Sequence, residues 1–367
     1  MRKKTRQRLA FLLGRPFSPL YGALMRKRAA WYRSGVMASS ALPVPVISIG
    51  NLTMGGTGKT PMTIYVADRL QGAGYRPAII SRGYGGKARQ AVNLVSDGAR
   101  CLLDAGQAGD EPRLMAENLP GVIVATGVNR AAAADFAVRE LGADIIVLDD
   151  GFQHLGLRRD LDLVLFKAPV FMGNGRVFPG GDLREPVDAL ARADGFVVTG
   201  VDRRNRAAAD EFKSFLERDF PGRPVFMAEY RLKSLTDRQG AVAGPEVFDQ
   251  KLYGFCGLAE PGGFLLTVSD QGISLYGFSV FADHHPYSGA DLAALVEDAG
   301  RYGCDGLLTS EKDMVKLKGL SCPLPIYSLN VELRMPPSFD DFLLSGMAGR
   351  GLASVPNPMN VSFPPLE

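Results

Sequence analysis

The sequence predicts an α/β protein of two lobes, and three observations support this prediction. Short apolar runs rich in β-branched residues alternate with helical segments, a pattern typical of a mostly parallel sheet covered by helices on both faces. The alternation extends to about residue 200 and then begins again. The chain has 367 residues, which is enough for two lobes that each bury their own core.

The expected strands of the first lobe are apolar runs that end near glycine or acidic residues. They occupy residues 43–50, 76–83, 122–127, 143–151, 161–166 and 193–200. Residues 61–74 and the alanine-rich stretch 129–142 are predicted as helices, because both contain helix-forming residues and stop at a glycine.

The second lobe is expected to begin with a helix at 208–220, followed by a long strand at 223–235. The remaining expected elements are a strand from 251 that enters a glycine-rich loop reaching 264, a strand from 272 into a polar turn at 281–285, a helix at 288–303, and strands at 304–313 and 324–335. We therefore divide the chain into an N-terminal segment (1–35), a first α/β domain (36–200), a second α/β domain (201–335) and a partly mobile tail (336–367).

The N-terminal segment mixes cations with apolar residues. MRKKTRQR opens the chain, and residues 9–35 interleave leucines, tyrosines and a tryptophan with arginines and a lysine. This composition is typical of a helical hairpin on an anionic lipid surface. It is equally compatible with a helix that packs on the next domain and exposes a basic face to solvent. Composition alone leaves both alternatives open.

The bulk composition excludes several other classes of protein. No stretch approaches the roughly 20 apolar residues of a membrane span, and no signal-peptide cleavage site follows the basic start, so we expect neither an integral nor a secreted protein. The four cysteines lack C-x-x-C spacing and indicate neither a zinc site nor a disulfide framework. The net charge of +3 is too small to indicate nucleic-acid binding, and we expect none.

One predicted strand runs directly into a glycine-rich stretch, SIGNLTMGGTGKTP at 48–61. A phosphate-binding loop needs inward-pointing backbone N–H groups, the N-terminus of a helix, and a lysine that reaches the β- and γ-phosphates. This stretch has these features, although Thr53 replaces the first glycine of the usual pattern. The predicted nucleotide-binding residues are Thr53, Met54, Gly55, Gly56, Thr57, Gly58, Lys59 and Thr60. The first lobe is therefore expected to be P-loop NTPase-like, and a glycine-rich turn without a ligand is the disfavoured alternative.

Acidic residues follow the predicted strand at 143–151. Asp149 and Asp150 come at its carboxyl end, where a carboxylate can bind the Mg²⁺ of a nucleotide together with the Thr60 hydroxyl. An acidic turn with no metal is the alternative, and it becomes unfavourable once the strand is paired with a phosphate loop. Asp149, Asp150 and Thr60 are the predicted metal ligands.

Three further stretches indicate catalytic residues. Asp110 lies in AGDEPRLMA, where ordinary helix capping is the alternative function. Arg184 lies in a glycine- and proline-rich loop at 174–186, in which an arginine can clamp phosphates. FADHHPYS holds two of the three histidines of the chain, His284 and His285, beside an acidic residue. Histidines this scarce, in polar loops, are more typical of a site than of a core.

Two other classes of nucleotide-binding protein fit less well. The partition-type ATPases carry a signature lysine where this chain has Met54. GTPases read guanine with N-K-x-D or T-K-x-D, whereas TSEKD at 309–313 has Glu311 in place of the lysine. Both classes are disfavoured.

The ordered set of motifs resembles the tetraacyldisaccharide 4'-kinase family, the lipid A 4'-kinases of Gram-negative bacteria, from about residue 9 to about residue 330. The motifs that carry the resemblance are GNLTMGGTGKTP, SRGYGGK, GDEP, TGVNR, VLDDGFQH, LREP, FADHH and TSEKD. The resemblance implies two α/β lobes joined by a two-stranded linker, with an N-terminal helical region at the membrane. It also implies transfer of the γ-phosphate of ATP, with Mg²⁺, to the 4'-hydroxyl of a tetraacylated glucosamine disaccharide 1-phosphate. The implied location is peripheral, on the cytoplasmic face of the inner membrane.

The resemblance also assigns roles to individual residues. It implies that Asp110 is the base on the sugar hydroxyl and that a histidine of FADHH, His284 in preference to His285, works with it. The further implied catalytic residues are Lys59, Arg130, Arg184 and Glu185. We expect a monomer. The alternative function is a regulatory or metallochaperone NTPase without a small-molecule phosphoryl acceptor.

Overall fold

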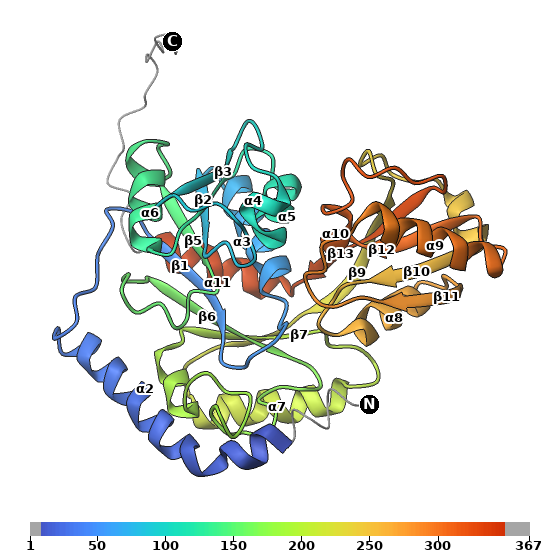
Figure 1. Ribbon diagram of the computed structural model, residues 1–367. Helices are drawn as coiled ribbons and strands as arrows, with labels where there is room; N and C mark the ends of the chain where they lie inside the picture. The colour runs from blue at the N-terminus through green and yellow to red at the C-terminus, as the bar shows by residue number, and fades with distance from the viewer. Residues whose placement is uncertain (1–8, 349–367) are drawn as a thin grey trace, which may run out of the picture.

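The computed structural model describes residues 9–348. These residues form two lobes, each built on one sheet (Figure 1). Within this range the larger sheet has eight strands in the order β3-β4-β2-β5-β1-β6-β7-β8, and the smaller sheet has five in the order β11-β10-β12-β13-β9. The predicted α/β class with a mostly parallel first sheet is confirmed.

The strands of the first sheet are short and buried on both faces, as continuous apolar runs predict. They are β1 (Val46–Asn51), β2 (Pro77–Ser81), β3 (Asn93–Asp97), β4 (Ile123–Thr126), β5 (Ile145–Asp149), β6 (Leu161–Lys167), β7 (Gly195–Thr199) and β8 (Val225–Met227). Only β3, which the sequence did not predict, runs antiparallel to its neighbour in this sheet. Because β1 pairs in parallel with β5, their carboxyl ends meet at the same edge of the sheet.

Helices cover both faces of this sheet. They are α3 (Lys59–Gly72), α4 (Ala105–Ala108), α5 (Asp110–Asn118), α6 (Arg130–Arg139) and α7 (Arg206–Asp219), with a 3-10 turn η2 (Val187–Arg192). Alternate residues of β1 show the two faces, since Ile47 packs in the core beneath α3 and α5, whereas Val46 packs in the core beneath α6. The aromatic core beneath α7 lies on the same side of the sheet as α6.

The last strand of the first sheet along the chain, β8, ends at Met227. The boundary between the two lobes therefore follows residue 227, whereas the sequence placed it near residue 200. The expected single strand at 223–235 is two strands, β8 in the first sheet and β9 (Glu229–Thr236) in the second, with the buried Ala228 between them. The stretch from 225 to 235 contains neither glycine nor proline, so its pattern shows no break at the point where the chain leaves one sheet for the other.

The second sheet also contains β10 (Leu252–Cys256), β11 (Leu275–Val280), β12 (Gly306–Ser310) and β13 (Ile326–Arg334). Its helical elements are η3 (Pro245–Asp249), α8 (Pro261–Asp270), α9 (Gly289–Arg301) and α10 (Glu311–Met314). α8 begins inside the stretch predicted as a glycine-rich loop. Its first residue is Pro261, and proline is favoured at the first helical position. The two glycines that follow favour a loop, and the sequence prediction therefore missed the helix start. The long antiparallel pair β9 and β13 connects the two lobes, as the resemblance implied.

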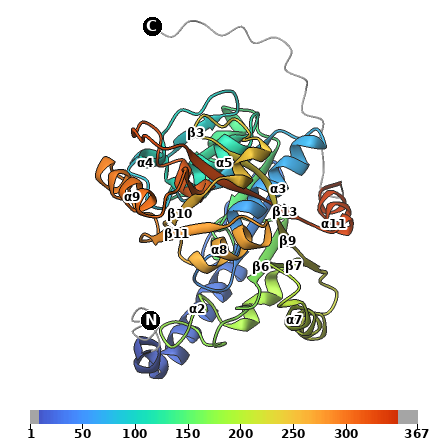
Figure 2. The same cartoon turned by 90° about the vertical axis from the view of Figure 1, so that its right-hand side faces the viewer.

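The last described helix returns to the first lobe. α11 (Pro337–Ala348) lies beside α3 (Figure 2), and Phe339 and Leu343 are fully buried in the first-lobe core. Residues 337–348 therefore form a docked helix where the sequence predicted a partly mobile tail. The rest of the predicted tail, 349–367, lies outside the described residues.

The N-terminal region is a bent helical rod along the lower edge of the molecule (Figure 1). Residues 9–14, η1 (Arg15–Phe17) and α2 (Ser18–Arg33) follow one another without a loop, so the expected hairpin is absent from the described residues. Ser18 and Gly22 face the first lobe, whereas the outward residues Leu20 and Leu24 are 72% and 52% exposed. Among the described helices, none has the length and apolar character needed to cross a bilayer.

Replacing Phe339 by alanine tests whether α11 is part of the first-lobe core. The ring is fully buried and lies edge-on to Tyr65 and Phe226. We expect F339A to lower the free energy of unfolding by about 3–5 kcal/mol, measured by urea unfolding followed by circular dichroism. Leu344→Ala, at a partly buried position of the same helix, is the control and should cost less. A loss for F339A no larger than that of the control would show that α11 is not docked in solution.

Candidate active site

A cleft of about 1370 Å³ lies between the two lobes. Its first-lobe wall contains the glycine-rich loop at 55–60 and the carboxyl ends of β2 and β5. Its second-lobe wall contains the loop with His284, the start of α10 and the start of α8. The predicted phosphate loop and His284 therefore face one common space, whereas Asp110 is not among the residues that line it.

The phosphate loop connects β1 to α3 in a backbone conformation that requires glycine at two positions. Gly58 is the N-cap of α3 with φ of 81°, and a Cβ there would lie 2.1 Å from Tyr230 Oη. Gly55 has φ of 121° and open space around it. The loop is fixed from below, because the Thr199 hydroxyl donates to the Thr57 carbonyl at 2.8 Å. The first turn of α3, with its free N–H groups, is therefore presented to the cleft.

The entrance of the loop explains why Thr53 can replace a glycine. Thr53 forms a β-bridge with Leu183, and the N–H of Met54 donates to the Asp182 carbonyl at 2.7 Å. Thr53 is thus in paired, extended backbone and is not among the residues with positive φ. The same pairing brings the 174–186 loop against the phosphate loop and directs Arg184 to the cleft.

The two acidic residues at the end of β5 have different surroundings. The Asp149 carboxylate is enclosed and accepts hydrogen bonds from Ser81 Oγ at 3.0 Å and Thr63 Oγ1 at 3.4 Å. Burial, followed by repulsion from Glu111, raises the pKa of Asp149 to about 6. A buried carboxylate with a raised pKa is a group that a nearby cation stabilises in its charged form.

Asp150 is the centre of a cationic cluster. It has φ of 54°, and its carboxylate accepts two hydrogen bonds from Arg184 Nη1, at 2.8 and 2.9 Å. Lys59 Nζ lies 3.5 Å from Asp150 Oδ1 and also contacts Asn51. Burial alone would raise the pKa of Asp150, but Lys59 and Arg184 outweigh it, so the pKa is lowered. Asp150 therefore holds Lys59 and Arg184 together at the floor of the cleft.

Arg130 lies behind this cluster, at the start of α6. Its guanidinium is buried, which lowers its pKa, and Nη1 lies 3.3 Å from His154 Nδ1. Burial and the neighbouring cations Arg130, Arg159 and Arg28 lower the pKa of His154 to about 4, so this histidine is neutral at pH 7. Arg130 is not part of the cleft wall.

Glu185 was predicted as a catalytic residue, but the structure does not bring it to the cleft. Its carboxylate is buried and binds Arg192 Nη2 at 3.0 and 3.1 Å, on the side of the loop that faces α2. Arg184 and Glu185 are adjacent in a bent segment, and their side chains bind partners on different sides of it, Asp150 and Arg192. Glu185 thus stabilises the loop that carries Arg184.

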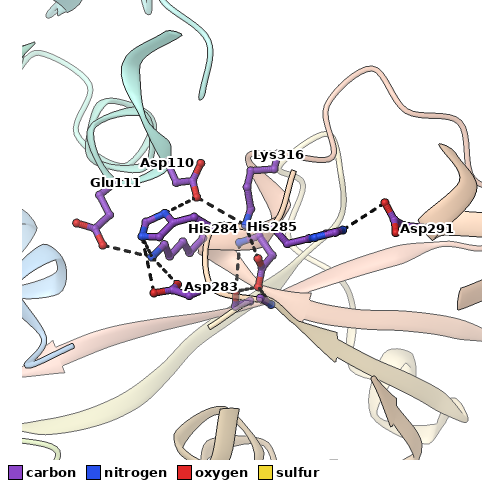
Figure 3. Close-up of polar contacts among 11 residues, drawn as sticks. Asp110, Glu111, Asp283, His284, His285, Asp291 and Lys316 are labelled. Atoms are coloured by element: carbon purple, nitrogen blue, oxygen red, sulfur yellow. Dashed lines mark hydrogen bonds and ion pairs between the residues drawn. The ribbon is translucent and has the colours of Figure 1, made fainter. Parts of the chain in front are cut away.

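Asp110 and His284 meet across the two lobes (Figure 3). Asp110 is the first residue of α5, and its Oδ2 lies 3.0 Å from His284 Nδ1. Burial raises the pKa of Asp110, but the hydrogen bond with His284 and the charge of Lys316 more than offset this, so the pKa is lowered. The His284 ring lines the cleft, edge-on to Tyr84, with Asp110 behind it.

His285 faces away from Asp110, so the structure distinguishes the two histidines. Its Nε2 lies 3.3 Å from Asp291, and its ring packs against Phe281 and Tyr287 in the second-lobe core (Figure 3). The sequence could not separate them, since neighbouring residues of a turn have no fixed orientation.

Several residues around the site were missed in the sequence. Lys312 Nζ lies 3.3 Å from Glu111 Oε1 and 3.4 Å from Asp283 Oδ1, and it therefore binds one acidic residue from each lobe. Ser81 binds Asp149, and Lys316 approaches Asp110. Ser81 lies in SRGYGGK and finds its partner on a neighbouring strand of the same sheet, whereas Lys312 and Lys316, in or after TSEKD, find partners on the other lobe. Neither kind of contact is a local pattern of the sequence.

Comparison with known proteins agrees with this geometry. The family model described as tetraacyldisaccharide-1-P 4'-kinase matches residues 9–348. A tetraacyldisaccharide 4'-kinase of Desulfotalea psychrophila is 44% identical over 94% of this chain and 98% of the relative. One of Syntrophotalea carbinolica is 42% identical over 88% of this chain and 87% of the relative.

A solved structure has the same architecture. The crystal structure of the "apo" form of LpxK from Aquifex aeolicus in complex with ATP is 30% identical and superposes with a TM-score of 0.74. The match covers 90% of this chain and 98% of that chain. On these grounds the chain belongs to the tetraacyldisaccharide-1-phosphate 4'-kinase family.

Proposed function

We propose that this protein transfers the γ-phosphate of ATP to the 4'-hydroxyl of a tetraacylated glucosamine disaccharide 1-phosphate, a step of lipid A biosynthesis. The observation that carries the proposal is the Asp110–His284 pair, whose histidine lines the cleft that holds the phosphate loop. A regulatory or metallochaperone NTPase needs a nucleotide site but no acid–base pair opposite it, and membership of the kinase family also favours the transferase.

The first lobe supplies the nucleotide site. The backbone of residues 53–60 is suited to the β- and γ-phosphates, with Lys59 and Arg184 as cations on the group transferred. Arg130 adds positive potential from behind Asp150. In phosphoryl transfer such arginine contacts contribute about 10³- to 10⁵-fold.

The residues at this edge also fit Mg²⁺. The described residues contain no cluster of three or more His, Cys, Asp and Glu side chains, but Mg²⁺ on a nucleotide needs only one or two carboxylates beside phosphate oxygens and water. Asp149, buried with a raised pKa, Asp150 and the Thr60 hydroxyl would hold it. When bound, Mg²⁺ neutralises charge on the β- and γ-phosphates.

The Asp110–His284 pair would handle the proton. The acceptor 4'-oxygen forms a bond to the γ-phosphorus while the bond from that phosphorus to the β,γ-bridging oxygen breaks. The hydroxyl proton passes to the pair late in this step, because a loose transition state does not require prior deprotonation. His284 orients the Asp110 carboxylate and shares the proton.

The two lobes would have separate tasks. The first binds nucleotide, and the second brings His284 and closes the cleft, which limits hydrolysis of ATP by water. Both lobes come from one chain, so a monomer contains the whole site. A high ATPase rate without acceptor would contradict this gating.

The N-terminal rod would place the enzyme at the membrane. Leu20, Leu24 and Trp31 recur on the outward face of α2, with Lys27 above the Trp31 ring. An exposed apolar stripe beside cations is typical of a helix in the interface of an anionic bilayer. We therefore propose peripheral attachment to the cytoplasmic face of the inner membrane of a Gram-negative bacterium, where the acyl chains of the acceptor stay in the bilayer.

Incubation of the purified protein with radiolabelled ATP and a membrane lipid extract tests the function. We expect label in a chloroform-soluble glycolipid. Nucleotide-dependent dimerisation with no labelled lipid would support the regulatory NTPase instead.

Asp110→Ala tests the proton acceptor. We expect kcat to fall about 10²- to 10⁴-fold with ATP affinity nearly unchanged, because the carboxylate acts on the hydroxyl and not on the nucleotide. Kinetics at saturating acceptor and calorimetric titration with ATP measure the two quantities. Asp135→Ala, in an exposed pair on α6, is the control. Near-normal kcat for D110A would remove Asp110 from the mechanism.

A pair of histidine variants tests the orientation of the turn at 281–288. His284→Gln should lower kcat about 10²-fold or more, since the glutamine cannot share the proton. His285→Gln should retain most of the activity, because His285 faces Asp291. Thermal unfolding of both variants separates loss of stability from loss of turnover. Equal losses of kcat at equal stability would contradict the assignment.

Polar substitutions on α2 test attachment to the membrane. Leu20→Ser with Leu24→Ser should raise the apparent KM for acceptor in vesicles, whereas the KM for ATP should not change. These positions make better tests than deletion of 1–33, because deletion also removes Ser18 and Gly22 from the fold. Val280→Ser, 60% exposed on the second lobe, is the control. An unchanged acceptor KM would favour a purely structural role for the rod.

A further inference from the structure

Lys316 is a buried cation at the contact between the lobes. It follows α10, its side chain is 7% exposed, and Nζ lies 2.7 Å from Asp313 Oδ1. The same Nζ lies 3.6 Å from Asp110 Oδ2 on the other lobe (Figure 3). It also lies 5.1 Å from the centre of the Tyr287 ring. One ammonium group is thus shared between a second-lobe carboxylate and the proposed proton acceptor.

The hydrogen bonding of this ammonium is incomplete. Within the described residues, neither Lys316 Nζ nor Asp313 Oδ1 has a partner in hydrogen-bond geometry, so their contact is an ion pair without a directed hydrogen bond. Asp313 Oδ2, in contrast, accepts from Ser310 Oγ at 2.6 Å and from the Gly257 N–H at 2.9 Å. Asp313 is therefore rigidly held, while Lys316 keeps N–H groups free towards Asp110. A buried, undersatisfied charge is costly, and such groups gather at functional sites.

Among the described residues, the groups that lower the pKa of Asp110 come from the second lobe. His284 Nδ1 donates a hydrogen bond to its carboxylate, the charge of Lys316 is next, and Lys312 acts at longer range. From the first lobe, Glu111 is the adjacent acid, and it is itself paired with Lys312. When the second lobe is withdrawn, Asp110 keeps its place at the start of α5 but loses every one of these partners.

We propose that Lys316 is a positioning residue of the transfer reaction, which holds Asp110 as a carboxylate only when the second lobe has closed onto α5. The proton acceptor would then be ready only in the assembled site. This inference rests on the proposed role of Asp110, and it adds a residue that couples closure to the charge of that carboxylate.

The sign of the pH effect follows from the contact. Groups of the second lobe lower the pKa of Asp110, because they favour its charged form. The contact between the lobes is therefore stabilised while Asp110 is a carboxylate. This stabilisation is lost when the pH falls through the pKa that Asp110 has in the closed contact. Removing the Lys316 charge must therefore move the protonation of Asp110 to higher pH. An opposite charge within about 4–6 Å shifts a carboxyl by about one unit or more.

Lys316→Met tests the proposal through the pH profile of kcat. We expect the acidic limb to move up by about one pH unit, which is about a tenfold loss of kcat at a pH on that limb, while the KM for ATP stays unchanged. Lys318→Met is the matched control: Lys318 also bridges the lobes, 2.7 Å from Glu117, but is exposed and does not contact Asp110. An unmoved limb in K316M, or an equal shift in K318M, overturns the proposal.

Two additions keep the test decisive. If K316M does not fold, because Asp313 is left unpaired, Asp313→Asn with Lys316→Met removes both charges together and should show a smaller shift in the same direction. NMR of ¹³Cγ-labelled aspartate, with the Asp110 signal assigned by its loss in Asp110→Asn, follows the carboxyl without any turnover. A shifted titration in a protein without lipid kinase activity would reject the proposed function and retain the Lys316–Asp110 coupling, whereas an unshifted titration rejects the coupling itself.

Discussion

The contact between Asp110 and His284 is the interaction on which the site depends. The two residues are 174 positions apart in the chain, and no sheet contains both. They meet because β9 and β13 carry the second lobe away from the first and back, while α5 presents its N-terminus at the cleft. Any change in the angle between the lobes separates the imidazole from the carboxylate, although each lobe stays folded.

Several polar pairs join α5 to the second lobe, which would suit a contact that opens and closes. Besides the Asp110 pair, Asn118 donates to Glu311 at 2.6 Å, and Lys312 and Lys318 bind Glu111 and Glu117 on α5. Each lobe has apolar cores of its own, although Leu333 of β13 and Tyr230 of β9 pack against the first-lobe core where the two strands leave that lobe. An exposed pair such as Lys318–Glu117 contributes little net stability, because water competes for the same groups. Lys312 is more buried, so its pairing with Glu111 depends more strongly on the two lobes being in contact.

The sequence predicted those parts of the site that are local. β1, the phosphate loop, α3 and the acidic end of β5 are each contiguous, and parallel pairing brings them to one edge of the sheet. The sequence could not predict which of two neighbouring side chains in a turn or loop faces the cleft. For this reason it predicted Glu185 as a catalytic residue together with Arg184. For the same reason His285 remained an alternative to His284. Lys316 has no local signature at all, since its significance comes from a carboxylate on the other lobe.

The N-terminal rod is attached to the first lobe, on the side that holds the proposed nucleotide site. Ser18 Oγ donates to the Val177 carbonyl, and Arg28 donates to the carbonyl of Gln153. Gln153 in turn donates to the Asn51 carbonyl at the end of β1 and contacts Arg184. The rod is thus attached, through a few hydrogen bonds, to the strand that leads into the phosphate loop. A membrane surface held by α2 would then keep a constant distance to the γ-phosphate, so only the second lobe has to move when the acceptor is bound.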